Sequence, residues 1–197
     1  MSSVICGLAV SVDGFITGCD TGPGRGLGDG GALFDWYGSG DVPSKVFDGF
    51  HLTEPSARIF DALASRIGAS LAGHTTYTDS ENFAGGAPHP TAPLVVLSHS
   101  AFAPANGRQT IVTTGIGDAI EEAKRLAADK DVGLMGGVPV TEALKAGLVD
   151  ELILHQVPIL LGAGRRFFNA RPEHIRLRIR EVVSAPDVTH LHYEVQR

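Results

Sequence analysis

The chain has 197 residues, 43% of them hydrophobic and 19% charged, which is enough to bury one sizeable core and unlike a disordered protein. Its 22 acidic side chains outnumber the 16 basic ones, and the net charge of -6 argues against nucleic acid as a partner. No apolar stretch approaches the roughly 20 residues that span a bilayer, and the start lacks a signal-peptide pattern. We therefore expect one domain over residues 1–197, cytoplasmic and without a membrane partner.

The cysteines and the paired histidines near the end of the chain do not indicate a metal site. Cys6 lies in an apolar run and Cys19 in a glycine-rich loop, so they form neither a disulfide framework nor a zinc motif. His190 and His192 fall on one face of a strand pattern, but no third ligand is evident, and we interpret them as exposed polar positions. We predict no metal, and no zinc-dependent deaminase domain in this sequence.

The first quarter of the chain contains one strand and one long loop. Residues 4–10 form a short apolar run with β-branched side chains, which predicts a strand ending at Ser11-Val12-Asp13-Gly14. Residues 18–49 are rich in glycine and aspartate and carry Trp36 and Tyr37, which we expect to be exposed. A loop of this length in a compact domain is usually functional or mobile, so we interpret it as a lid or a wall of the substrate site.

The middle of the chain alternates strands with helices, a pattern typical of a parallel sheet. Residues 54–67 have helical spacing of their apolar side chains after an acceptable start at Thr53 and Pro55. Asp118, with Glu121 three residues later, predicts the start of a second helix. The predicted strands of this part are short apolar or β-branched runs: residues 69–72, 94–97, 110–113 and 132–135.

The last quarter of the chain has a different pattern. A third helix is expected between Gly136 and Gly147, and after Asp150 only extended segments follow. These are residues 152–161, 176–183 and 188–195, which we predict to be antiparallel strands. The predicted fold class is therefore α/β, with a central, mostly parallel sheet flanked by helices and finished by C-terminal antiparallel strands.

Two glycine-led turns give the strongest chemical signal. In Gly73-His74-Thr75-Thr76-Tyr77 a strand leads into backbone N–H groups and hydroxyls that can hold an anion. In Gly136-Gly137-Val138-Pro139-Val140-Thr141, paired glycines let a ligand approach the start of a helix. Two such sites suit a diphosphate, although each alone equally fits an ordinary turn without a ligand. A third pattern, Gly26-x-Gly28-x-x-Gly31, begins too far after the first strand to be a dinucleotide fingerprint.

Five short motifs follow one another in a recognisable order: residues 9–18, residues 73–77, Leu97-Ser98, residues 135–137 and residues 157–164. Their order resembles the dihydrofolate reductase-like superfamily over nearly the whole chain. Within it, the sequence is similar to the reductase domain of bifunctional riboflavin-pathway enzymes and to their stand-alone bacterial relatives. This resemblance implies a dihydrofolate reductase-like α/β fold, NADPH lying across the ends of the strands, and a homodimer.

The resemblance also assigns residues to the cofactor. The backbone of Ala9 and Ile16 would hold the amide of the nicotinamide. Ser98 and His99 stand where the family binds the adenosine 2′-phosphate, often with arginine. Because histidine is a weaker and pH-dependent partner, the choice between NADPH and NADH stays open. The remaining residues would bind the diphosphate: Gly73, His74, Thr75, Thr76, Gly136, Gly137, Val138 and Thr141.

Asp13 is the first candidate for the catalytic acid, because the riboflavin-pathway group shares the Ser-x-Asp-Gly signature found here. The alternative is an aspartate that bonds the backbone of its own turn before Gly14. Dihydrofolate reductases place a carboxylate early in the helix that faces the substrate, where this sequence has Ala57. Asp61 lies one turn later, with its direction unsettled, so folate reduction is the second choice.

We therefore predict an NADPH-dependent reductase that transfers hydride to a small heterocyclic substrate, with the ribosylamino-pyrimidine of riboflavin synthesis as the named candidate. The predicted substrate-binding residues are Trp36, Phe60 and Asp61, although burial of Trp36 under the loop is an equal alternative. A non-catalytic nucleotide-binding protein that kept the fold is the competing hypothesis. Residues 157–161 are the candidate surface for the homodimer, and Pro158 among them also suits an edge strand.

Overall fold

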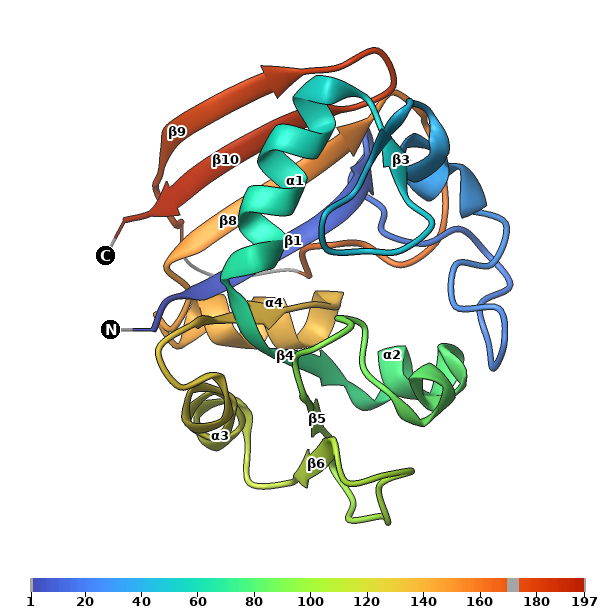
Figure 1. Cartoon of the computed structure of the whole chain (residues 1–197). Coiled ribbons are helices and arrows are strands. Elements are labelled where there is room, and N and C mark those ends of the chain that lie inside the picture. Colours follow the sequence, from blue (N-terminus) through green and yellow to red (C-terminus); the bar gives the residue numbers. More distant parts are fainter. Residues whose placement is uncertain (1, 170–173, 197) are drawn as a thin grey trace.

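The protein, described by a computed structural model over residues 2–169 and 174–196, is built around one eight-stranded sheet (Figure 1). Its strands lie in the order β6 (Gln109–Val112), β5 (Leu94–Leu97), β4 (Ile67–Gly73), β7 (Asp131–Leu134), β1 (Val4–Ser11), β8 (Glu151–Val157), β10 (Thr189–Val195) and β9 (Leu177–Ser184). The first six are parallel, whereas β10 is antiparallel to both β8 and β9. The predicted α/β class, with C-terminal antiparallel strands, is confirmed.

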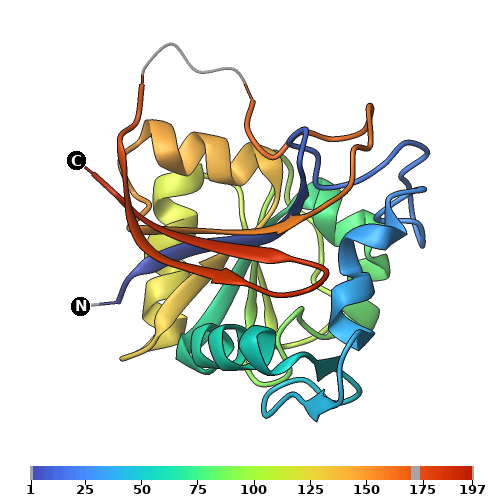
Figure 2. The ribbon, with the colours of Figure 1, turned by 90° about the horizontal axis from the view of Figure 1, so that it is seen from above.

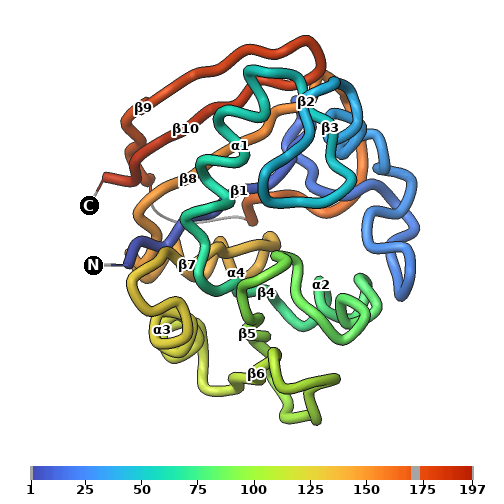
Figure 3. The backbone as a smooth tube through the Cα atoms, in the orientation of Figure 1, coloured from blue at the N-terminus to red at the C-terminus, as the bar shows by residue number. Residues whose placement is uncertain are grey.

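Helices cover both faces of the sheet. α1 (Glu54–Arg66) lies over one face, and α3 (Ile116–Ala127) and α4 (Gly137–Lys145) lie on the other (Figures 1 and 2). The short helix α2 (His74–Asp79) follows β4. The trace shows the start of β1 and the end of β10 on the side of the molecule opposite the long N-terminal loop (Figure 3). Within the described residues, we find no helix of sufficient length and apolarity to span a membrane.

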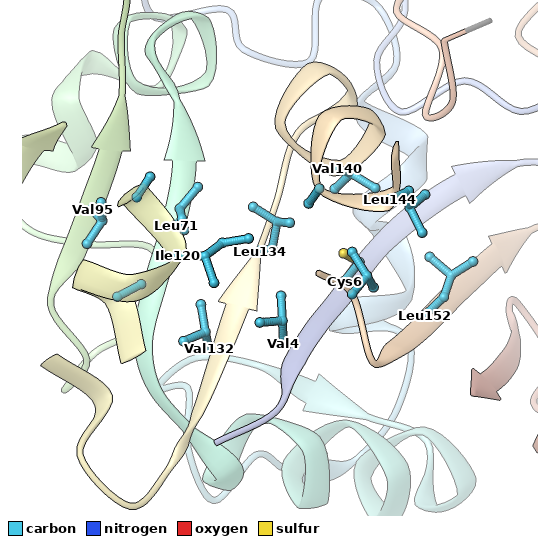
Figure 4. Close-up of a cluster of buried hydrophobic side chains, with 14 of the residues drawn as sticks. Val4, Cys6, Leu71, Val95, Ile120, Val132, Leu134, Val140, Leu144 and Leu152 are labelled. Atoms are coloured by element: carbon cyan, nitrogen blue, oxygen red, sulfur yellow. The ribbon is translucent and has the colours of Figure 1, made fainter. Parts of the chain in front are cut away.

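The larger hydrophobic core lies between the sheet and the helices α3 and α4 (Figure 4). Ile120 and Leu144 from these helices pack against side chains of the central strands. β5, with the sequence Leu-Val-Val-Leu, buries three consecutive side chains, as expected of a parallel strand covered on both faces. Cys6 belongs to this core, and burial raises the pKa of its thiol far above the usual range, so it is a neutral apolar side chain.

The segment predicted as a long loop is more ordered than expected. It contains a 3₁₀ helix (Gly31–Gly38) and a small hairpin formed by β2 (Val42–Pro43) and β3 (His51–Leu52). The prediction that Trp36 is exposed is wrong, because its side chain is 1% exposed. Leu33 and Trp36 are three residues apart, so one face of the 3₁₀ helix directs both into a second, smaller core. A further turn after α2 (Glu81–Gly85) has left-handed backbone angles.

Three other expectations are corrected, two at the ends of elements and one at a side chain within β10. α3 begins at Ile116 with Gly115 as its N-cap, so Asp118 lies within its first turn instead of capping it. β8 ends at Val157, before Pro158, whose missing N–H cannot continue the ladder. His190 is fully buried, contrary to the predicted exposed position, because its side of β10 lies beneath α1.

The C-terminal end of α1 is fixed to the sheet by a polar network. Arg66 Nε lies 2.8 Å from Asp131 on β7, and Arg66 Nη2 lies 2.7 Å from Glu151 on β8. His192, which we expected to be exposed, donates to Glu151 at 2.7 Å. The hydrogen bond from His192, followed by those from Arg66, lowers the pKa of Glu151 to about 2. The helix is thus anchored to two strands at once.

Replacing Leu71 tests the position of the larger core. Leu71 on β4 is 0% exposed, so Leu71→Ala is expected to lower the free energy of unfolding by about 2–5 kcal/mol. Leu160→Ala is the matched control, because Leu160 is 72% exposed and its truncation should cost about 0.5 kcal/mol or less. Urea denaturation followed by circular dichroism measures both, and equal losses would contradict this core.

Candidate active site

A cavity of about 1650 Å³ opens at the carboxyl ends of the parallel strands, the place where open α/β sheets bind ligands. β1, β4, β5 and β7 each line it with their last residues or with the turn that follows. It continues beneath α1, over Gly7 of β1 and Ile153 of β8. We call the part around residues 73–76 and 136–138 the turn region, and the part beneath α1 the aromatic region.

The turn region is formed by the two glycine-led turns, which touch each other. Gly73 precedes α2 and Gly136 precedes α4, and neither helix has a side-chain cap on its first N–H groups. A Cβ on Gly73 would lie 3.0 Å from Cγ of Pro139, and one on Gly136 would lie 3.1 Å from Oγ1 of Thr76. Gly136 also has a φ of 93°, which larger residues rarely adopt. Glycine is therefore strongly favoured at Gly136, and at Gly73 any side chain would press on the neighbouring turn.

The start of α4 is suited to an anion. Its first N–H groups have no partners within the helix, and the positive end of the helix dipole favours negative charge. The neighbouring segment supplies Arg165 and Arg166, two lining residues that our sequence analysis did not assign to the site. Arg165 is oriented by Asp79 at 2.6 Å, and the Arg166 guanidinium lies 4.6 Å from the centre of the Phe15 ring. The turn region thus combines free N–H groups with guanidinium groups.

Most of the predicted cofactor residues line this cavity, namely Ala9, Ile16, Gly73, His74, Thr75, Thr76, Ser98, His99, Gly136, Gly137 and Val138. Thr141 is the exception, because it is 1% exposed and its hydroxyl accepts the N–H of Asn169 at 3.1 Å. The Ser98 hydroxyl donates to the carbonyl of Ser100 at 2.8 Å, whereas His99 is exposed. Cofactor binding by these residues stays a prediction.

Asp13 lies outside the lining of the cavity. Its carboxylate accepts hydrogen bonds from Ser11 Oγ at 2.6 Å and from the N–H groups of Leu161 at 3.2 Å and Gly162 at 2.7 Å. The bond from Ser11, supported by the two backbone bonds, lowers the pKa of Asp13 to about 2. The carboxylate therefore fastens the loop after β8 to the turn after β1. This geometry corresponds to the turn-bonding alternative and gives the predicted catalytic role no support.

Of the predicted substrate residues, Phe60 lines the cavity, whereas Trp36 and Asp61 lie behind its wall. Asp61 accepts hydrogen bonds from Ser44 Oγ at 2.5 Å and from the N–H of Lys45 at 2.9 Å, so it holds the hairpin loop. Trp36 packs edge-on against Phe60, with ring centres 5.5 Å apart. Among the described residues, none accepts a hydrogen bond from Trp36 Nε1. Both side chains thus fix the loop to α1 and do not line the cavity.

Aromatic rings form the wall beneath α1, and they are Phe34, Tyr37, Phe47, Phe50 and Phe60. Tyr37 and Phe50 stack at 4.4 Å, and Phe47 and Phe50 stack at 5.2 Å. Three of these rings, those of Phe34, Tyr37 and Phe47, come from residues 18–49, so the predicted long loop does line the cavity. We missed Phe34, Phe47 and Phe50 because they follow no helical or strand period. Burial raises the pKa of Tyr37 far above its usual range, so the wall is uncharged.

Two histidines on neighbouring strands meet at this aromatic region. His155 on β8 is the register partner of His190 on β10, and their Nδ1 atoms lie 2.7 Å apart. His155 lines the cavity, and His190 lies behind it, with Nε2 2.9 Å from Ser56 Oγ on α1. Burial lowers the pKa of His155 to about 3, helped by repulsion from His190, and that of His190 to about 4. Across the described part of the chain, no three histidine, cysteine or acidic side chains are grouped to hold a metal ion.

The fold and the cavity define an α/β protein with a cleft at the carboxyl ends of its parallel strands. The chain belongs to the family of the RibD C-terminal domain, which it matches over residues 2–191. The family that the order of short motifs suggested is thereby confirmed. No match to a curated protein was found.

Solved structures share this fold. A putative riboflavin biosynthesis protein from Shewanella sp. PV-4 has a TM-score of 0.70 and 24% identity, with 100% of both chains covered. A pyrimidine reductase-like protein from Corynebacterium diphtheriae has a TM-score of 0.63 and 16% identity, covering 100% of this chain and 92% of that one. A diaminohydroxyphosphoribosylaminopyrimidine deaminase/5-amino-6-(5-phosphoribosylamino)uracil reductase from Thermotoga maritima has a TM-score of 0.61 and 12% identity. The match covers 99% of this chain and 57% of the Thermotoga chain.

The buried histidine pair predicts a loss of stability in mild acid. An unfolded histidine takes up a proton near pH 6.5, whereas His155 and His190 resist protonation down to about pH 3 and 4. As the pH falls below 6.5, the unfolded state therefore binds more protons, and the free energy of unfolding falls by up to about 1.4 kcal/mol per pH unit for each histidine.

This loss is measured by urea denaturation at pH 7.5 and pH 5. His190→Gln should reduce the difference between the two pH values by about a third to a half, because it removes one buried base while His155 and His89, whose pKa burial also lowers, remain. His51→Gln is the control, since the His51 side chain is exposed on β3 and the difference should not change. An unchanged difference in His190→Gln would refute the assignment to the pair.

Proposed function

We propose that the protein is an NADPH-dependent reductase that transfers hydride to a small heterocyclic substrate. The observation that carries this proposal is that two uncapped helix starts, after Gly73 and Gly136, meet at one cavity whose other region is lined by aromatic rings. The helix starts suit the diphosphate of a dinucleotide, and the aromatic rings suit a planar substrate next to it. Membership in the RibD C-terminal domain family, and the reductase descriptions of the Corynebacterium and Thermotoga relatives, support the same chemistry.

The residues of the turn region fit a phosphorylated dinucleotide. Because Gly73 and Gly136 have no side chains, the two turns can touch and both helix starts face one space, and Arg166 adds positive charge to its lining. The backbone of Ala9 and Ile16 would hold the nicotinamide amide. When bound, the cofactor supplies the hydride, and the chain supplies position and electrostatics.

The end of β5 would hold the adenosine part of the cofactor. Ser98 and His99 both line the cavity there, and His99 is exposed, so it can reach a 2′-phosphate. An imidazole holds such a phosphate best when protonated, so the preference for NADPH over NADH should weaken as the pH rises.

The aromatic region would hold the flat ring of the substrate, because stacked side chains bind planar heterocycles well. A pyrimidine of the kind named for the Thermotoga relative fits this wall in shape. Folate reduction is less well supported. The residues that α1 contributes to the lining near Phe60 are the apolar Leu63 and Ala64, and the Asp61 carboxylate is turned away to the hairpin.

Cofactor binding is tested at Val138, which is 60% exposed in the first turn of α4 and lines the cavity. Val138→Glu places a negative charge beside the proposed diphosphate and is expected to raise the Kd for NADPH about tenfold or more. Val138→Gln, of similar size but uncharged, should bind nearly as well as the original protein. Thermal-shift titration measures both, since saturation at 100 times Kd adds about 2.7 kcal/mol. If neither NADPH nor NADH at millimolar concentration raises the melting temperature, the proposed binding of a nicotinamide cofactor is refuted.

Turnover is tested by following NADPH oxidation against a panel of pyrimidines, pterins and quinones. A reductase is expected to oxidise NADPH with at least one planar heterocycle and to show slower reaction with pterins than with pyrimidines. Replacing Phe60 by alanine should raise KM for that substrate while leaving the Kd for NADPH unchanged, because Phe60 lines only the aromatic region. Binding of NADPH without oxidation by any substrate would instead favour a non-catalytic nucleotide-binding protein.

A further inference from the structure

Four polar side chains form a continuous hydrogen-bonded chain from the cavity to the start of α1. His155 Nδ1 lies 2.7 Å from His190 Nδ1, and His190 Nε2 lies 2.9 Å from Ser56 Oγ. Thr53 Oγ1 donates to Ser56 Oγ at 3.1 Å, and Thr53 is the half-buried N-cap residue of α1. The other three residues are buried, so the chain leads from the cavity through the core to a group that water can reach.

His155 has one ring nitrogen left for a ligand. Its Nδ1 is bonded to His190, and its ring lines the cavity near Phe60, which leaves Nε2 for a substrate. His89, which also lines the aromatic region, differs in this respect. Its Nε2 donates to the carbonyl of Ala64 at 3.1 Å, and its Nδ1 accepts backbone N–H groups.

The two carboxylates that line the cavity within the described chain are each paired with a basic side chain. Asp79 lies 2.6 Å from Arg165, and Glu142 lies 2.9 Å from Lys145. Reduction of a C=N or C=O bond needs a proton at the nitrogen or oxygen in addition to hydride at the carbon. Of the groups described here, His155 is the one that faces the aromatic region with a free nitrogen and a route to solvent.

We propose that His155 protonates the substrate, and that His190, Ser56 and Thr53 return the proton to it from water. This inference rests on the proposed reductase function. It also narrows the substrate to a planar ring with a C=N or C=O bond, whose heteroatom accepts a hydrogen bond from Nε2–H of His155.

The protons and electrons balance. The substrate carbon gains hydride from a nicotinamide donor, the π electrons of the double bond move to the heteroatom, and this atom takes the proton from His155 Nε2. His155 Nδ1 then takes the proton of His190 Nδ1, and His190 Nε2 takes that of Ser56. Ser56 is reprotonated by Thr53, and Thr53 takes a proton from the solvent, so each hydride transfer consumes one proton from the medium. Every side chain is then neutral, with the two imidazole tautomers reversed and each hydrogen bond of the chain retained. After product release, uptake of one proton at His155 Nε2 from the open cavity and release of one through Thr53 restore the starting tautomers for the next turnover.

The surroundings keep both rings neutral, as this exchange requires. Ala9 on β1, Trp36 on the 3₁₀ helix and Phe60 on α1 surround His155, and all are uncharged. The charged groups on this face of β8 and α1, Glu151 and Arg66, pair with each other at the opposite end of the strand. The depressed pKa values of both histidines agree with this environment.

Ser56→Ala tests the outer part of the chain without touching the cavity. We expect a fall in kcat of about tenfold, a changed solvent deuterium isotope effect, and a Kd for NADPH within twofold of the original. Ser65→Ala is the matched control, because Ser65 is an exposed serine on the same helix whose hydroxyl bonds only the carbonyl of Ala62. It should change none of these quantities. Equal kcat values and isotope effects in the two variants would overturn the relay.

His155→Gln tests the donor itself. Its kcat should fall by about a hundredfold or more with the Kd for NADPH preserved, and an unchanged kcat would overturn the donor role. A thermal melt of each variant shows that it is folded.

Nitrogen-15 NMR of the imidazoles tests the chain without any substrate. At pH 7 we expect two neutral rings with a scalar coupling across the N–H···N bond between His155 and His190, and an altered tautomer ratio in Ser56→Ala alone. A charged ring, or no coupling, would overturn the proposal. Failure of NADPH binding would count against the proposed function, whereas binding and turnover with identical Ser56→Ala and Ser65→Ala variants would count against the relay alone.

Discussion

The close approach of the turns that follow β4 and β7 is the constraint on which the rest of the site depends. These strands are parallel neighbours, with Leu71 and Leu134 in register, so their carboxyl ends arrive side by side. Gly73 and Gly136 then allow the turns to touch, where any Cβ would press on the opposite turn. As a result, the starts of α2 and α4 present their N–H groups to one cavity. A sheet with these strands apart would have two separate turns and no shared anion site.

α1 is held to the sheet by polar contacts at both ends and by few in between. Near its start Ser56 bonds His190, and in its last turn Arg66 joins Asp131 and Glu151. Between them the helix turns Phe60 toward the cavity. The distance between α1 and the sheet is therefore set by hydrogen bonds and ion pairs at the two ends of the helix. These directional contacts hold the helix away from the sheet better than apolar packing alone would. A cavity beneath a helix needs such supports, because unsupported apolar faces collapse onto each other.

The sequence allowed the sheet, the helix order and the turn region to be predicted, because each depends on local patterns. Buried parallel strands appear as short apolar runs, and glycine marks the turns between strand and helix. The aromatic region could not be found in this way. Phe47 and Phe50 reach it through an irregular loop, and His190 was misjudged because alternation along β10 shows two faces without showing which one α1 covers. Asp13 and Asp61 were ambiguous for a similar reason, since their partners lie in segments whose position only the fold determines.

Trp36 is the only tryptophan in the chain, and its position gives it a further significance. Its ring centre lies 5.1 Å from that of His155 and 5.2 Å from that of His190, in a buried environment where none of the described residues accepts a hydrogen bond from its N–H. Indole fluorescence shifts with the polarity of its surroundings and is quenched by a protonated imidazole in contact. The intrinsic emission of the protein therefore originates beside the histidine pair. The fluorescence of Trp36 therefore reports both the entry of water into the aromatic region and any protonation of the His155 or His190 imidazole.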